Sequence, residues 1–74
     1  MSRLILTFPT LFQVLAADKV LQGRFEFRPT PTPPGLSADI CGMSIELLKF
    51  NQKDDAISYL AEANLEPMGV HVIE

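Results

Sequence analysis

The single cysteine, Cys41, is the residue of this chain with the most distinctive chemistry. Near the amino end of a helix, unpaired amides and the helix dipole stabilise a thiolate, the nucleophilic form of the side chain. Gly42 follows directly and permits close backbone approach, so that its N–H and that of Met43 can point toward an anion. Arg28 can add positive charge, whereas the carboxylate of Asp39 would oppose the thiolate. These residue types permit a reactive thiol, and the opposing charges of Arg28 and Asp39 leave its thiolate fraction open.

The same cysteine also has a purely structural interpretation. Cysteine is among the residue types most often buried, and Cys41 alternates in phase with the apolar Met43, Ile45 and Leu47. On this pattern alone, an inert position in the core is favoured over a reactive one. The depth of the sulfur distinguishes the two interpretations, and at this point both are open.

Length and composition limit the class of protein. The chain has 74 residues, 47% of them hydrophobic, six Lys and Arg, and a formal net charge of -3. So few basic residues argue against a nucleic-acid or membrane surface, and one cysteine without a Cys/His cluster argues against a disulfide framework or a zinc site. No segment approaches the ~20 apolar residues of a membrane span. We expect a single cytoplasmic domain over residues 1–74, with no metal and no cofactor.

Apolar periodicity predicts six secondary-structure elements. Alternating or β-branched runs indicate strands, and apolar residues at helical spacing between a cap and a stop indicate helices. Thr10 and Gln13 have the spacing of a capping box, in which each side chain satisfies the other residue's free amide. In chain order we predict a strand over 3–8, a helix over 11–22, strands over 25–28 and 41–48, a helix between Asn51 and Asn64, and a strand over 68–73.

A proline-rich segment separates the second and third predicted strands. The stretch P-T-P-T-P-P over 29–34 contains four of the six prolines, which lack the N–H groups that a strand ladder needs. We therefore predict one long, stiffened loop over 29–40. It contains five further candidate site residues, namely Pro31, Thr32, Pro33, Ser37 and Asp39.

The element order β-α-β-β-α-β predicts an α+β, ferredoxin-like sandwich. Its sheet has four antiparallel strands in the spatial order fourth, first, third, second, and two helices cover one face. In this topology Cys41 lies at the same edge of the sheet as Thr10, the proline loop, Arg28 and the turn over 64–67. On the opposite face, Glu46 follows the outward phase of its strand and is expected to be solvated.

Three segments of the chain resemble a known family. They are the opening R-L-I-L-T-F-P-T, the helical A-A-D-K-V-L, and P-T-P-P-G-L-S-A-D-I-C-G-M-S-I. Together they resemble the selenium/sulfur carrier protein-like family of short bacterial domains, over essentially the whole chain. The resemblance implies that Cys41 is the carrier residue and that residues 7–8 and 31–33 shape its rim. Pro34 stands where the family pattern has a basic residue, which leaves an anion-holding role to Arg28.

The resemblance implies a carrier rather than a complete enzyme. Such a carrier would hold sulfur or selenium covalently on Cys41 and pass it between donor and acceptor proteins, with Thr10, Arg28, Gly42 and Met43 around the bound anion. The alternative is a non-catalytic binding or oligomerisation module with a buried structural cysteine. Contacts would then come from Ile5, His71 and Ile73 on the open sheet face. A homodimer is compatible with both functions.

Overall fold

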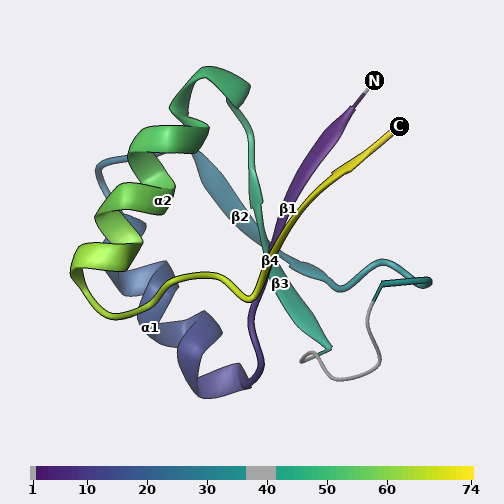
Figure 1. Cartoon of the computed structure of the whole chain (residues 1–74), viewed down its shortest axis with the longest axis horizontal. Helices are drawn as coiled ribbons and strands as arrows, with labels where there is room; N and C mark the ends of the chain where they lie inside the picture. Colours follow the sequence, from purple (N-terminus) through teal and green to yellow (C-terminus); the bar gives the residue numbers. More distant parts are fainter. Residues whose placement is uncertain (1, 37–41) are drawn as a thin grey trace.

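A computed structural model describes residues 2–36 and 42–74 and shows a sheet with two helices on one of its faces (Figure 1). The sheet has four strands in the order β2-β3-β1-β4, and all neighbouring pairs are antiparallel. This confirms the predicted α+β, ferredoxin-like fold and its strand order. The elements are β1 (Arg3–Thr7), α1 (Leu11–Leu21), β2 (Phe27–Pro31), β3 (Met43–Leu47), a 3-10 turn (Phe50–Gln52), α2 (Lys53–Glu62) and β4 (Gly69–Ile73).

The hydrophobic core lies between the sheet and the two helices. The register pairs Leu4 with Leu47 and Leu6 with Ile45, so that large aliphatic side chains of neighbouring strands lie side by side. Each core residue is at most 2% exposed. The core consists of Leu4, Leu6, Phe8, Val14, Ala17, Leu21, Ile45, Leu47, Ala56 and Leu60. Burying this surface provides the main favourable term for a domain of this size.

Helix α1 begins and ends close to the predicted residues. Thr10 Oγ1 accepts a hydrogen bond from the Gln13 N–H at 3.2 Å, as an N-cap does. The predicted capping box is nevertheless only half formed, because the buried Oε1 of Gln13 has no hydrogen-bond partner in the described chain. Gly23 follows the helix with a φ of 75°, the left-handed conformation that ends many helices.

Strand β2 corrects the prediction for the proline-rich segment. The predicted strand over 25–28 lies instead over Phe27–Pro31, so the strand enters the stretch that we expected to be loop. The prolines are tolerated because β2 is an edge strand and they occupy alternate positions. Thr32 N–H donates to the Gly42 oxygen at 2.8 Å, which shows that the even-numbered residues face β3. The main-chain nitrogens of Pro29 and Pro31, which carry no hydrogen, therefore point to the outer edge of the sheet, away from β3.

The third strand and the second helix are shorter than predicted. β3 covers Met43–Leu47 instead of 41–48, and residues 37–41 lie outside the described part of the chain. Asn51 lies inside the 3-10 turn, and Gln52 precedes α2 without a side-chain cap. Because the 3-10 turn occupies Phe50–Gln52 and ends directly before Lys53, Asn51 does not stand at the N-cap position of α2. Asn64, with a φ of 59°, provides the predicted left-handed stop.

The carboxylate of Glu46 is buried on the sheet face opposite the helices, which corrects the expectation of a solvated side chain. Glu46 is 5% exposed. Its Oε1 accepts hydrogen bonds from Arg3 Nη2 at 3.0 Å and Arg28 Nε at 3.2 Å, and its Oε2 accepts one from Arg3 Nε at 3.3 Å. The two hydrogen bonds from Arg3, followed by the one from Arg28, lower the pKa of Glu46 against the opposing effect of burial. One side chain of β3 thereby links β1 and β2.

Replacing Glu46 by Gln tests this link. The variant keeps the shape of the side chain but leaves two guanidinium groups without their anion, so we expect the free energy of unfolding at pH 7 to fall by about 1–3 kcal/mol. Urea denaturation followed by circular dichroism measures it. Glu26→Gln is the matched control, because Glu26 pairs with Lys49 at 2.9 Å on an exposed surface. It should cost about 0.5 kcal/mol or less, and equal losses in the two variants would contradict the role of burial.

The same carboxylate predicts a pH dependence of stability. Because the folded-state pKa of Glu46 is lowered, its contribution is complete above the ordinary pKa that glutamate has in the unfolded chain. The contribution is lost as the pH falls through the lower, folded-state value. We therefore expect the difference in unfolding free energy between the wild type and Glu46→Gln to be constant near neutrality and to shrink in acid. A difference that persisted at the lowest pH at which both proteins fold would contradict this assignment.

Candidate functional site

The candidate site lies at the end of the sheet where α1 begins and β3 starts. Figure 1 shows the amino end of α1 and the start of β3 at the same end of the molecule. There the Thr32 N–H to Gly42 oxygen bond, at 2.8 Å, continues the β2–β3 ladder by one pair beyond Pro31 and Met43. We call this end of the sheet, with Thr10, Thr32, Gly42 and Met43, the rim.

Three of the predicted site residues, Ser37, Asp39 and Cys41, lie outside the described residues. Their neighbours on either side are described. Leu36 ends the first described segment, and Gly42 begins the second at the rim. The described part of the preceding loop, residues 32–36, extends away from the helices (Figure 1). Gly42, the residue that follows Cys41 in the chain, therefore lies at this end of the sheet.

Gly42 and Met43 differ in their surroundings. Gly42 is exposed, and a Cβ added to it would meet nothing within 4 Å among the described residues. The close backbone approach that we predicted for this glycine is therefore not made by any described part of the fold. Met43 is half-buried and packs against the core. Met43 thus anchors the start of β3, while Gly42 has no contact of this kind with the described residues.

Thr10 uses its side chain to cap α1. Its Oγ1 accepts from Gln13 N–H and its main-chain oxygen accepts from Val14 N–H at 3.2 Å. For the N–H groups of Leu11 and Phe12 we find no hydrogen bond within residues 2–36 and 42–74. Two free amides at a helix start carry partial positive charge, the environment that favours an anion. This positive end of α1 lies at the same end of the molecule as the start of β3, whereas Cys41 itself lies outside the described residues.

Arg28 lies away from the rim. It pairs with Glu46 in the middle of the sheet, four residues along β2 from Thr32, or roughly 13 Å at the rise of a strand. Its Nε donates to Glu46, and its side chain is otherwise largely exposed. The structure therefore does not bring Arg28 together with Thr10 and Gly42. The strand register, which local sequence patterns do not specify, places Arg28 opposite Glu46 instead.

A pair of hydroxyl groups joins the loop to the sheet beside the rim. Thr32 Oγ1 and Ser44 Oγ are 2.6 Å apart, and Ser44 is fully buried. Of the flanking prolines, Pro31 is exposed and Pro33 is half-buried. Ser44 was not a predicted site residue. Its position between apolar residues of β3, in the phase opposite to Ile45, was the signal that could have identified it.

Residues 7–8 lie beneath the rim rather than on its surface. Thr7 is 1% exposed and Phe8 is fully buried in the core. Thr7 Oγ1 donates to the Gly69 oxygen at 3.3 Å and lies 3.4 Å from His71 Nε2. A Cβ on Gly69 would come within 2.7 Å of that nitrogen, so glycine is needed for the imidazole to approach. Thr7 and Phe8 are therefore interior residues and not part of an exposed surface.

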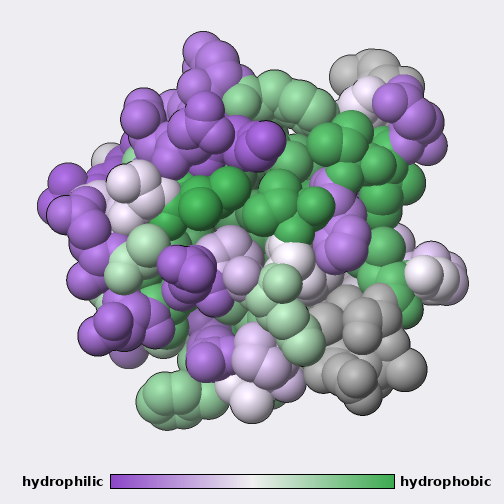
Figure 2. All heavy atoms as spheres, viewed as in Figure 1, coloured by the Kyte–Doolittle hydropathy of each residue, from purple (hydrophilic) through white to green (hydrophobic). Residues whose placement is uncertain are grey.

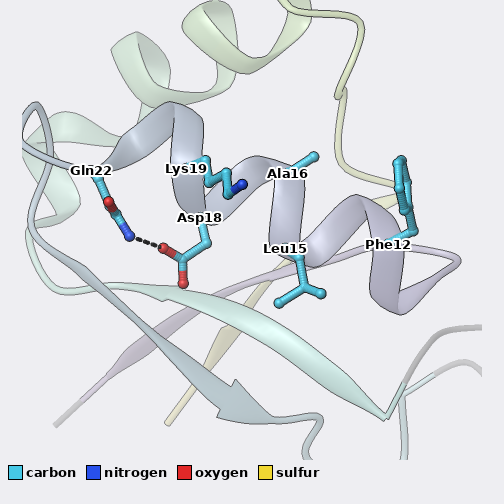
Figure 3. A pocket seen from close by; sticks show the side chains of 6 residues that line it. All are labelled: Phe12, Leu15, Ala16, Asp18, Lys19 and Gln22. Atoms are coloured by element: carbon cyan, nitrogen blue, oxygen red, sulfur yellow. Dashed lines mark hydrogen bonds between the residues drawn. The ribbon is translucent and has the colours of Figure 1, made fainter.

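The solvent-facing side of α1 forms a separate apolar surface. It carries Leu11, Phe12 and Leu15, which are 51%, 80% and 56% exposed. A shallow depression follows this face from Phe12 to a hydrogen bond between Gln22 Nε2 and Asp18 Oδ1 of 2.8 Å (Figure 3). Exposed apolar surface of this kind is typical of sites where proteins contact each other. It holds no cluster of metal-ligating side chains, and none exists elsewhere in the described residues.

Comparisons with known proteins identify the family. No curated protein and no solved structure matches the chain. Among the described residues, no helix has the length and hydrophobicity that crossing a bilayer requires. The sequence profile of the family described as "Putative Se/S carrier protein-like" matches residues 3–72, nearly the whole chain, including Cys41 and both βαβ halves of the fold. The chain belongs to this Se/S carrier protein-like family.

Proposed function

We propose that this domain carries sulfur or selenium on the thiol of Cys41 and passes it between proteins. The observation that carries the proposal is the family match over residues 3–72 in a chain whose only cysteine is Cys41. A thiolate can form a covalent bond to sulfur or selenium that a second nucleophile can later cleave. No other side chain of the chain can both form such a bond to sulfur and release the sulfur again by exchange.

The geometry of the rim supports this role. Gly42, the neighbour of Cys41, is exposed, and no described residue lies within 4 Å of the place where a Cβ on it would be. The amides of Leu11 and Phe12, which make no hydrogen bond within residues 2–36 and 42–74, begin α1 at the same end of the sheet (Figure 1). Positive partial charge near an accessible thiol increases the fraction of thiolate and would stabilise the anion of a bound persulfide. The proposed roles of Gly42 and Met43 are to leave this space open and to anchor the strand behind it.

The proposed loading step is a transfer of sulfane sulfur. The Cys41 thiolate attacks the terminal sulfur of a donor persulfide, a new S–S bond forms, and the S–S bond of the donor breaks with its electron pair on the donor thiolate. The terminal proton stays on the transferred sulfur or is lost to water according to pH. Unloading is the same exchange toward an acceptor thiolate. No oxidant is consumed, because a disulfide-type bond breaks for each one that forms.

The proposal also assigns partners and a compartment. A domain that performs only this exchange needs a donor protein and an acceptor protein, and it is a carrier rather than a complete enzyme. A free thiol persists in the reducing cytoplasm, where we place the reaction. The proposed site comprises Cys41 as nucleophile, Gly42, Met43 and Thr10 at the rim, and the loop residues Pro31, Thr32, Pro33, Ser37 and Asp39.

Intact-mass measurement tests the covalent step. The reduced protein, incubated with glutathione persulfide and freed of excess reagent, should gain the mass of one sulfur atom. Dithiothreitol should remove that mass and release sulfide. Because Cys41 is the only thiol, Cys41→Ser should gain nothing under the same conditions. An adduct of the same mass on Cys41→Ser would contradict the proposal.

The rate of alkylation distinguishes the carrier from a binding module with a buried cysteine. We expect iodoacetamide to label Cys41 in the native protein at least as fast as in the urea-denatured chain, because an exposed thiolate reacts directly. A buried structural cysteine would react only when the protein unfolds. Labelling that required denaturation would therefore reject the carrier and favour the module, and peptide mapping would verify the labelled residue.

A further inference from the structure

The two edges of the sheet differ in their capacity to bind another strand. Edge strands expose unpaired main-chain groups, and proline on the outer side is one way in which proteins block them. In β2 the outward positions include Pro29 and Pro31, which have no N–H to offer. The β2 edge is therefore closed to pairing along most of its length.

The β4 edge has no such protection. Because the even residues of β3 face β2, its odd residues face β1, and Leu4 and Leu6 of β1 face β3 in turn. Arg3, Ile5 and Thr7 consequently face β4, where they pair with Ile73, His71 and Gly69. This alternation directs the N–H and C=O groups of Val70 and Val72 outward, away from the sheet.

The side chains of the same two residues are also uncovered. Val70 and Val72 are 40% and 55% exposed, although they lie on the face that the helices cover elsewhere. Met68, directly before the strand, is 47% exposed. Hydrophobic surface gathers in the middle of the face seen in Figure 2, where β4 lies in front in Figure 1. Main-chain donors and an apolar surface therefore coincide at one edge.

We propose that β4 binds β4 of a second copy of this chain, in an antiparallel pair that joins two sheets into one. In the register that places Val70 opposite Val72 of the second copy, the outward N–H and C=O groups of both residues are satisfied in both copies. The four valines then lie side by side on the helix-covered face, as cross-strand apolar pairs do. A two-fold axis perpendicular to the sheet relates the copies, so both helix layers lie on this face.

The small number of charged residues along β4 favours a second copy of the chain as the partner of this strand. The only charged residue of the segment 68–74 is Glu74, and in the proposed register it lies opposite Met68 of the second copy. With histidine counted as neutral, no like charges face each other across the axis, where His71 of the two copies lie opposite each other, and the acidic net charge of the chain is carried elsewhere. His71 points to the opposite face and lies against Thr7 of its own chain. The inference is independent of the sulfur chemistry, because neither Cys41 nor the rim takes part.

Sedimentation equilibrium of the full chain tests the pairing. Between about 1 µM and about 1 mM, the range in which small interfaces dissociate, the wild type should pass from the 8.2 kDa monomer to a particle of twice that mass. Val72→Lys, which places a charge on the exposed apolar surface, should raise the dissociation constant by about tenfold or more. Val70→Lys provides a second variant, and circular dichroism verifies that both remain folded.

The matched control is Leu48→Lys. Leu48 is 50% exposed, close to the 55% of Val72, and it follows β3, which β1 separates from β4. This variant should dimerise like the wild type. Hydrogen exchange of the Val70 and Val72 amides should also slow as concentration rises. A wild type that stays monomeric throughout, an unchanged dissociation constant in both valine variants, or an equal loss in Leu48→Lys would each overturn the proposal.

Discussion

The carboxylate of Glu46 is the constraint on which the arrangement of the strands depends. It is buried between two guanidinium groups, one from β1 and one from β2, and so fixes three strands relative to one another. A slip of β3 by one residue would turn Glu46 into the hydrocarbon core and Leu47 out of it. Such a state would bury an unpaired charge, which is much more costly than the loss of a surface ion pair.

The register set in this way also determines the geometry of the rim. Once Arg28 lies opposite Glu46, Thr30 must lie opposite Ser44 and Thr32 near Gly42. The hydroxyl pair of Thr32 and Ser44 strengthens this end of the ladder. A central polar contact and a rim hydrogen bond thus hold the two strands that bound the segment containing Cys41.

The fold separates the surfaces that different tasks require. The rim, with its helix start and exposed glycine, lies at one end of the sheet, whereas the unprotected edge of β4 lies along its side. The apolar side of α1, with Leu11, Phe12 and Leu15, faces solvent. A domain of 74 residues buries a limited core, so a large share of its apolar residues stays at the surface. Among the described residues, most of the large exposed apolar side chains lie on α1 and on or next to β4, and Leu48 and Phe50 lie between β3 and α2.

The features that the sequence determined are those that depend on neighbouring residues. Alternating and helical periodicities are local, and so are the cap at Thr10 and the left-handed stops at Gly23 and Asn64, all of which the structure shows. Because six elements in this order have few compact arrangements, the topology followed from them. The identity of the candidate nucleophile needed no structure, since the chain has one cysteine.

Tertiary structure alone decided the environment of each element. Prolines exclude a segment from the middle of a sheet but not from its edge, and the strand order, not the local sequence, made β2 an edge. Likewise, alternation assigned Glu46 to the outward face, but its burial depends on arginines 43 and 18 residues away. The same contact removed Arg28 from the rim. Charge pairing between strands is a long-range property, because the register that brings partners together forms only when the sheet does.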